Sequence, residues 1–349
     1  MNSKKNILVA PLNWGIGHAT RCIPIILQLK KNNFNVIIMS SGRSLNLLNQ
    51  EFPKEKFIKL EDYNVKYSSF LPMQINILLQ IPKIIYGIYS EKRKISSIIK
   101  DYKIDGIISD NRYGLYSKEI PSVFITHQIK IQTPYLKELL KNINCHFIKK
   151  FSECWIPDND NDRIAGELSS THKTSIKYKY IGPLSRLQIQ KKKDHLEILA
   201  IVSGPEPQRT IFEKILTKEL KKTNKKSLLL QGKPEKNYSQ EFNNLTIKSH
   251  LKTEELNQVM TDANTIICRA GYSTIMDLIT LEKNATLVPT PGQTEQEYLA
   301  GFLSEKKRFK FQKQDEINLD LISSNIKEQC SKAFRKKNEW TKLFEIFNN

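Results

Sequence analysis

The stretch CRAGYSTIMDLITLEKNATLVPTPGQTEQEYLAGFL, residues 268–303, decides the fold. It overlaps residues 265–268, an apolar run that predicts a buried strand, and Gly271 then permits a tight turn where a side chain would be in the way. Apolar residues at helical spacing follow the turn, and Ser273 or Thr274 can cap the helix that they predict. The pattern therefore indicates a strand, a loop and a helix.

The same unit follows a second time. Residues 285–288 predict a strand, the prolines of residues 289–292 end it, and a helix is expected from Thr294. In a parallel sheet both loops emerge at the carboxyl ends of their strands, so residues 269–274 and 290–296 should line one crevice. Backbone N–H groups at a helix N-terminus suit an anion, and the second loop carries side chains that suit hydroxyl groups. A nucleotide sugar is therefore the first hypothesis for the ligand.

Size and composition are those of a globular chain that is long enough for two domains. The chain has 349 residues, of which 39% are hydrophobic and 26% charged. No apolar run approaches the roughly 20 residues that a membrane helix needs. The apolar part of the N-terminus is too short for a signal peptide, so a cytosolic location is expected. The five cysteines form no C-x-x-C motif and there is no obvious carboxylate pair, so the sequence predicts no disulfide frame and no metal site.

The chain is strongly basic, with a formal net charge of +19. Such a charge suits nucleic acid, an anionic membrane face or anionic substrates. Lys, Asn and Ile are all abundant, as expected of an AT-rich genome, and we assign most of the charge to that bias. A basic nucleic-acid-binding protein is the non-enzymatic alternative, and it predicts an affinity that falls steeply with salt.

A glycine-rich turn follows the first predicted strand, residues 6–12. Gly15 and Gly17 precede a helix, but the third glycine of a dinucleotide-binding fingerprint is missing. His18 lies at the N-terminus of this helix, where the positive end of the dipole disfavours a charged imidazole, so a neutral ring could accept a proton. The alternative is that His18 packs beside the turn.

Two further predicted strands end in polar residues at the same edge. Residues 104–109 lead to Asp110, which is either a general base or the N-cap of a helix that begins near Tyr113. Residues 122–125 lead to His127, which either orients a substrate or is an ordinary loop histidine.

Repeated strand–helix alternation predicts doubly wound parallel sheets. The predicted division is residues 1–183 for the first domain, 184–320 for the second, and 321–349 for a helix that packs back on the first. In the second domain the loop after residues 198–202 is a further candidate phosphate loop, because Gly204 lets the backbone approach an anion and Arg209 adds a charge.

The segment 70–94 combines an apolar run, interrupted by Pro72 and Pro82, with the basic residues that follow it. It predicts either a helix that lies on an anionic membrane surface or a helix that is buried against the sheet or lines an acceptor groove. The sequence leaves both open.

Three motifs carry a resemblance to a known family. NWGIGHATR at residues 13–21, CRAGYSTIMD at 268–277 and PTPGQTEQEY at 289–298 resemble the family 28 glycosyltransferases of the GT-B fold, in order and spacing over nearly the whole chain. The resemblance implies an α/β protein with two Rossmann-like domains whose parallel sheets face a central cleft. It implies transfer of a hexose or N-acetylhexosamine from a nucleoside diphosphate, chiefly UDP, to a lipid-linked or cell-envelope glycan, with no cofactor or metal, in the cytoplasm or on the inner face of the membrane.

The resemblance also implies roles for residues. Asp277 would bind the donor ribose, although Thr274 and Asp277 also fit a capping box. Gln296 would contact the donor sugar beside Glu297, where the family has a second Gln, and the backbone at Leu251 would read the base. The catalytic residues would be His18 and Asp110. The donor side would comprise Ser203, Gly204, Arg209, Leu251, Arg269, Gly271, Tyr272, Ser273, Thr274, Asp277, Gln293, Thr294, Glu295 and Gln296. The acceptor side would comprise Gly15, Gly17, Asn111, Arg112 and His127.

The second enzymatic hypothesis is a sugar-nucleotide 2-epimerase of the same fold. That class also binds a nucleotide sugar between two such domains, and it would release sugar in the absence of an acceptor. For the glycosyltransferase the expected partners are a nucleotide sugar and a glycan or lipid-linked acceptor, with no nucleic acid.

Overall fold

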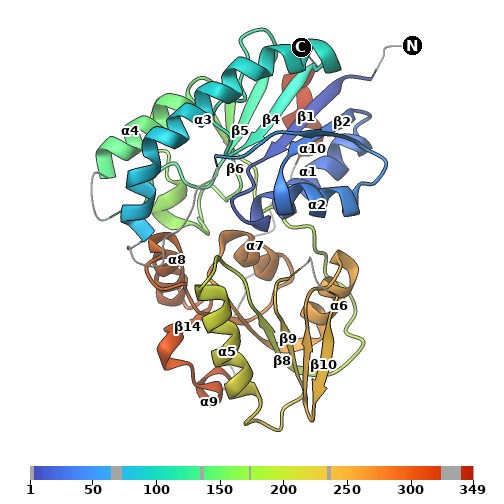
Figure 1. Ribbon diagram of the computed structural model, residues 1–349, viewed down its shortest axis with the longest axis vertical. Helices are drawn as coiled ribbons and strands as arrows, with labels where there is room; N and C mark the ends of the chain where they lie inside the picture. Colours follow the sequence, from blue (N-terminus) through green and yellow to red (C-terminus); the bar gives the residue numbers. More distant parts are fainter. Residues whose placement is uncertain are drawn as a thin grey trace. The chain divides into compact units, whose positions relative to one another are not determined.

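The computed structural model describes residues 4–63, 73–133, 137–172, 174–233, 237–323 and 339–348. The chain divides into two compact units, each with its own sheet (Figure 1). The first comprises Met1–Leu184 with Lys336–Asn349, and the second comprises Ser185–Arg335.

The first unit is built on a parallel sheet of seven strands in the order β3-β2-β1-β4-β5-β6-β7. The strands are β1 (Asn6–Pro11), β2 (Asn35–Ser40), β3 (Lys56–Lys59), β4 (Gly106–Asp110), β5 (Ser122–Ile125), β6 (Glu153–Ile156) and β7 (Tyr178–Tyr180). Its helices are α1 (Ile16–Lys31), α2 (Gly42–Glu51), α3 (Met73–Tyr102), α4 (Lys137–Ile148) and the short α10 (Trp340–Phe344). The strand order reverses between β1 and β4, where ligands bind in open α/β sheets.

Alternate residues of β1 face opposite sides of this sheet, as the period of a strand requires. Leu8 packs in one cluster with Ile95 of α3. Ile7 lies on the other side, where a Cβ added to Gly106 would meet both Ile7 and Phe347. Both faces of the sheet are therefore covered, which explains why its central strands are apolar at nearly every position.

The C-terminal segment belongs to the first unit. Phe344 and Phe347 pack edge-on against Phe34, with ring centroids 5.8 and 6.4 Å away, and both also lie 6.2 Å from Trp155. Phe344 and Phe347 are thus core residues of the first unit. Residues 324–338 of the predicted terminal helix lie outside the described residues.

The second unit has a sheet of seven strands in the order β10-β11-β9-β8-β12-β13-β14, parallel except for the β10–β11 pair. The strands are β8 (Leu196–Ile201), β9 (Ser227–Leu230), β10 (Ser239–Phe242), β11 (Leu245–Lys248), β12 (Ala263–Cys268), β13 (Ala285–Leu287) and β14 (Lys310–Phe311). The helices are α5 (Gln208–Leu220), α6 (Thr253–Asp262), α7 (Tyr272–Thr280), α8 (Thr294–Glu305) and α9 (Leu319–Ser323). In Figure 1, α5 runs along one face of the sheet, and its Phe212, Leu216 and Leu220 pack on β8 and β9.

Two local predictions were wrong. Residues 111–121 form no helix, so Asp110 is the last residue of β4 and caps nothing. Helix α7 begins at Tyr272 with Gly271 as its N-cap, so neither Ser273 nor Thr274 caps it, and the predicted capping box is absent from this described helix.

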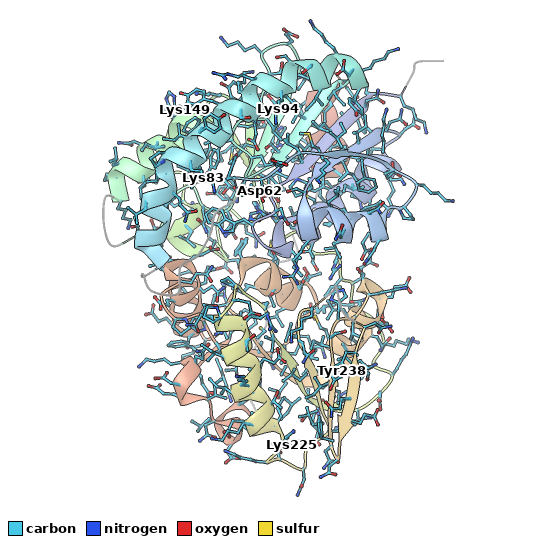
Figure 2. All side chains as sticks on the ribbon, viewed as in Figure 1. Asp62, Lys83, Lys94, Lys149, Lys225 and Tyr238 are labelled. Carbon is cyan, nitrogen blue, oxygen red and sulfur yellow. The ribbon has the colours of Figure 1, made fainter. Side chains whose placement is uncertain are left out.

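Exposed lysines occur in both units, among them Lys221 and Lys226 in the second. Lys83, Lys94 and Lys149 of the first unit are all exposed (Figure 2). Within the described residues, no helix has the length and apolar character needed to cross a membrane.

Gly114 and Gly301 make a pair of substitutions that tests the packing. A Cβ at Gly114 would lie 2.2 Å from the Ile88 carbonyl oxygen and 2.5 Å from Glu91 Cβ, whereas Gly301 of α8 has open space. We expect Gly114→Ala to lower the free energy of unfolding by about 1–3 kcal/mol. Gly301→Ala should raise it by about 0.5–1 kcal/mol, because alanine favours the helix. Denaturant titration measures both, and equal effects would contradict the described contacts.

Candidate functional site

The first part of the site lies at the switch point between β1 and β4. Helix α1 starts directly after β1 and presents His18 and, one turn later, Arg21 toward Asp110 at the end of β4. Gly15, with φ 91°, is the N-cap of this helix and makes the turn possible.

Asp110 is held by two side chains from α1. His18 Nδ1 lies 2.8 Å from Asp110 Oδ1, and Arg21 Nε donates to Oδ2 over 2.6 Å. A second guanidinium nitrogen of Arg21 also bonds Oδ1. Arg21 Nη1 further lies 3.2 Å from His127 Nδ1, so one guanidinium joins the carboxylate to a second histidine.

The electrostatics of the cluster favour an ionised carboxylate. Asp110 is 0% exposed and Arg21 is 2% exposed. Burial alone opposes ionisation, but the Arg21 charge, aided by His18, outweighs it and holds the pKa of Asp110 well below its usual range. A carboxylate with a lowered pKa is a weak proton acceptor, so these contacts suit an orienting group better than a general base, and the role of Asp110 stays a prediction.

His18 is the most exposed side chain of the cluster. Its side chain is 16% exposed, whereas that of Asp110 is 0%. Nδ1 faces Asp110, with Arg21 Nη2 3.0 Å away. In the tautomer whose Nδ1–H donates to the carboxylate, Nε2 is the nitrogen that can accept a proton.

The other predicted acceptor-side residues fall into two groups. Gly17 and Asn111 lie beside the cluster, in α1 and directly after Asp110, and Asn111 has φ 57°. Arg112 does not point to the cluster: it is 0% exposed, its Nε donates to Glu91 Oε1 over 2.8 Å, and its Nη2 donates to the Glu61 carbonyl over 2.7 Å. These contacts give Arg112 a structural role in place of the predicted contact with an acceptor.

The second part of the candidate site lies at the carboxyl edge of the other sheet. Strand β12 lies between β8 and β13, and the loops after β8 and β13 approach each other. A Cβ added to Gly204, which has φ 110°, would lie 3.6 Å from Thr290 Oγ1. The structure thus brings together the predicted phosphate loop and the predicted sugar loop.

Arg269, which the sequence predicts on the donor side, is bound by protein groups in the structure. Its side chain is 1% exposed, its Nη1 donates to the Pro289 carbonyl over 3.0 Å, and its Nη2 donates to the Gln208 carbonyl over 3.1 Å. The guanidinium also stacks 3.9 Å from the Phe212 ring. Burial lowers the pKa of Arg269 to about 9, so it stays charged near neutral pH. Its described hydrogen bonds join the segments around Pro289, Gln208 and Gln314, so its partners are protein groups.

Arg209 is likewise occupied by protein. Its Nε and Nη1 donate over 2.6 Å to Glu206 and Glu213, and Nη1 also reaches the Gln231 carbonyl at 3.1 Å. Arg209 is 6% exposed, and its guanidinium is already neutralised by the carboxylates of Glu206 and Glu213. It therefore contributes little positive charge to the loop that carries Ser203 and Gly204.

Asp277 lies on α7 and is half-buried. It accepts a hydrogen bond from Ser185 Oγ over 2.5 Å. Burial raises the pKa of Asp277 to about 6, against the smaller opposing effects of the Ser185 hydrogen bond and the Arg186 charge. Its predicted contact with a ribose stays a prediction.

The loop before α8 is stiffened by its own side chains. Gln296 is 7% exposed and accepts the Thr290 N–H over 2.9 Å, and Glu297 Oε1 accepts the Gly292 N–H over 2.8 Å. Gln296 is thus used to shape the loop. The other predicted donor residues lie at helix starts. The start of α7 contains Gly271, Tyr272, Ser273 and Thr274, and the start of α8 contains Gln293, Thr294 and Glu295. Leu251 is buried and precedes α6.

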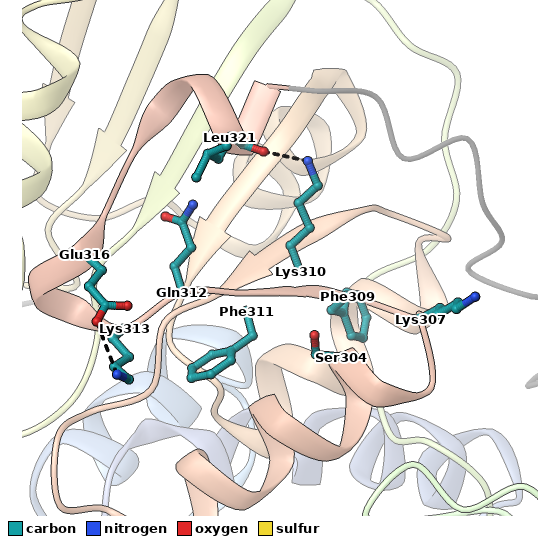
Figure 3. Close-up of a pocket in the computed structure, with 9 residues that line it drawn as sticks. All are labelled: Ser304, Lys307, Phe309, Lys310, Phe311, Gln312, Lys313, Glu316 and Leu321. Carbon is teal, nitrogen blue, oxygen red and sulfur yellow. Dashed lines mark hydrogen bonds and ion pairs between the residues drawn. The ribbon is translucent and has the colours of Figure 1, made fainter.

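A cavity of about 660 Å³ lies elsewhere in the second unit, at the edge strand β14 (Figure 3). Its lining residues are Ser304, Lys307, Phe309, Lys310, Phe311, Gln312, Lys313, Glu316 and Leu321. Lys310 donates to the Leu321 carbonyl over 2.7 Å and Lys313 pairs with Glu316 at 3.2 Å. No predicted site residue lines it, and lysines along a short edge strand are a common protection against strand pairing.

Across the described part of the chain, no group of three or more His, Cys, Asp or Glu residues is placed to hold a metal ion. Cys22, Cys145, Cys154 and Cys268 are buried free thiols, and Cys330 lies outside the described residues.

Comparison with known proteins gives the class. The model of the family described as glycosyl transferase family 1 matches residues 6–329. Solved structures with the same fold include MurG of Acinetobacter baumannii (17% identity, 92% of this chain and 89% of that chain, TM-score 0.54) and the calicheamicin glycosyltransferase CalG4 (12%, 93% and 91%, 0.64). A UDP-glucosyltransferase from Polygonum tinctorium is also similar (11%, 100% and 94%, 0.62). No curated protein sequence matches the chain.

The two doubly wound units and these likenesses define a glycosyltransferase of the GT-B fold. The chain belongs to glycosyl transferase family 1.

The raised pKa of Asp277 predicts a pH-dependent stability. Between its unfolded pKa near 3.8 and its folded pKa of about 6, the folded state binds the proton more tightly, so stability falls as pH rises through this window. Asp277→Asn, which keeps an acceptor for Ser185, should therefore melt higher than the wild type at pH 7.5, by a few degrees. The gain should shrink at pH 4.5.

Asp194→Asn is the matched control. A hydrogen bond from Lys226 lowers the pKa of exposed Asp194, so this variant should show no gain at pH 7.5. An Asp277→Asn gain that does not depend on pH would contradict the raised pKa.

Proposed function

We propose that the protein transfers a hexose or N-acetylhexosamine from a nucleoside diphosphate, UDP in the first instance, to a hydroxyl of a lipid-linked or envelope glycan. The observation that supports this most is the His18–Asp110 contact of 2.8 Å at the switch point of the first sheet. It pairs a partly exposed imidazole with a buried, ionised carboxylate, which is the arrangement of a general base and its orienting group.

In the proposed step, His18 Nε2 takes the proton of the acceptor hydroxyl as its oxygen attacks the anomeric carbon. The new C–O bond forms while the bond between the sugar and the diphosphate breaks, and the nucleoside diphosphate leaves with the bonding electrons. Asp110 stabilises the imidazolium that results. Arg21 keeps the carboxylate ionised and fixed, so the ring does not need to reorient.

The second unit would bind the donor. The first turn of α7 carries no acidic residue, so the positive end of its dipole and its backbone N–H groups suit a diphosphate. Because Arg209 and Arg269 are bound by protein groups, these backbone N–H groups would stabilise the leaving diphosphate. Asp277 would bind the ribose. Because Gln296 is engaged by the Thr290 N–H, Gln293 would contact the sugar in its place.

Substitution of His18 tests the reaction. We expect His18→Ala to lower kcat by about 10²–10⁴-fold, because general base catalysis contributes that much. Nucleoside diphosphate binding, followed by thermal shift, should stay unchanged, since the proposed donor residues belong to the other unit. Nucleoside diphosphate release with an acceptor present measures turnover.

His146→Ala is the matched control, because His146 is an exposed residue of α4 in the same unit and should leave kcat unchanged. Full turnover in His18→Ala would remove the proposed base. Conversion of the donor to an isomer without any acceptor would favour the epimerase.

We further propose that α3 contacts an anionic membrane. Its exposed side combines Leu79, Tyr86 and Tyr89, which are 68%, 73% and 54% exposed, with exposed Lys83 and Lys94. Aromatic residues interleaved with cations on one helix suit the interface of a bilayer. The start of the predicted segment, residues 70–72, lies outside the described residues.

Vesicle sedimentation tests this contact. The protein should bind phosphatidylglycerol vesicles and not phosphatidylcholine vesicles, with binding weakened by salt. The double variant Tyr86→Ser, Tyr89→Ser should bind several-fold more weakly. Tyr238→Ser, which changes a 44% exposed tyrosine of the other unit, is the control. Equal binding of the double variant and the control would contradict the proposal.

A further inference from the structure

The loop between β13 and α8 holds a buried hydroxyl that the fold does not use. Thr290 is 2% exposed, and its Oγ1 has no hydrogen-bond partner among the described residues. Its backbone is fully engaged: the N–H donates to Gln296 Oε1 over 2.9 Å and the carbonyl accepts the Gln293 N–H over 3.0 Å. The hydroxyl is therefore the one polar group of Thr290 that is left for another molecule.

This hydroxyl is held in a fixed position. Arg269 donates to the carbonyls of Val288 and Pro289 just before it, and Glu297 accepts the Gly292 N–H just after it. A buried hydroxyl without a partner is unfavourable, because it has lost its hydrogen bonds to water. Such a group is satisfied by an ordered water, an ion or a ligand, and the rigid contacts around this one fix where that partner must lie.

The hydroxyl faces the glycine turn after β8. A Cβ at Gly204 would lie 3.6 Å from Thr290 Oγ1, so the absence of a side chain at Gly204 keeps the space beside the hydroxyl open. Strand β12 lies between β8 and β13, so the two loops meet above its end, where the chain turns into α7. The hydroxyl is thus placed at the same sheet edge as the N-terminus of α7.

The local charges favour an anion at α7 rather than at α8. The first turn of α7 holds no acidic residue, whereas that of α8 carries Glu295 and Glu297. A hydroxyl can donate to a phosphate oxygen, and a glycine turn lets the backbone approach it closely. The geometry therefore suits a phosphate at the N-terminus of α7, beside the turn at Gly204 and the hydroxyl of Thr290.

We propose that Thr290 is a donor-binding residue that donates a hydrogen bond from Oγ1 to the diphosphate of the nucleotide sugar. The assignment rests on the proposed function of the second unit. It gives the loop after β13 a role in binding the leaving group, beside the side chains that would read the sugar.

Two substitutions separate the hydroxyl from the shape of the side chain. Thr290→Val removes the hydroxyl and keeps the branched shape, and Thr290→Ser keeps the hydroxyl. Because Oγ1 has no described protein partner, Thr290→Val should melt at or above the wild-type temperature without nucleotide. Its affinity for the diphosphate should nevertheless fall about 10-fold, as expected for one lost hydrogen bond to a charged group.

Calorimetric titration with UDP, TDP, ADP and GDP, and with the four corresponding nucleosides, provides the test. The diphosphate that binds the wild type should bind Thr290→Val about 10-fold more weakly and Thr290→Ser about equally, while its nucleoside binds all three proteins alike. Equal diphosphate affinity of wild type and Thr290→Val would overturn the assignment, as would an equal loss for the nucleoside. A wild-type protein that binds none of the diphosphates would instead overturn the proposed function itself.

Discussion

The pairing of Asp110 with Arg21 and His18 is the interaction on which the candidate site depends. A carboxylate at 0% exposure is costly unless a counter-charge and hydrogen bonds compensate it, and the Arg21 guanidinium supplies both. The same contacts fix the ring of His18, so one buried ion pair both stabilises the end of β4 and orients the group that would accept the proton. Arg21 lies one turn of α1 from His18, a spacing that presents both side chains on one face of the helix.

The second unit uses its charged side chains differently. Arg209 is neutralised by Glu206 and Glu213, and Arg269 is bound to backbone carbonyls, so neither presents its charge outward. Loops rich in proline have few N–H groups with which to satisfy neighbouring carbonyls, and a buried guanidinium with five donors can replace them. The groups left to face a ligand are then small ones: backbone N–H groups, Gly204 and the hydroxyl of Thr290.

Much of the fold followed from apolar runs that end in turn residues. The runs that became β1, β5, β12 and β13 are short and nearly continuous, as strands buried on both faces must be. The start of α8 at Thr294 followed from the prolines before it. Helices α4 and α5 were missed because their apolar residues are interspersed with lysines and polar residues. The edge strands β10 and β14 were missed because an edge strand needs little apolar sequence. The helix expected near Tyr113 was wrong, since Asp110 is used by Arg21 and His18 rather than as a cap.

The sequence by itself determined the alternation of strands and helices and the positions of the glycine turns. These depend on local spacing and on backbone conformations that side chains near in the chain impose. Only the tertiary structure decided which polar side chain meets which. Arg21 and Asp110 are 89 positions apart, and Arg269 and Gln314 are 45 apart. Burial in the folded core, which no local pattern records, determines whether such a charge binds a protein group or remains for a ligand.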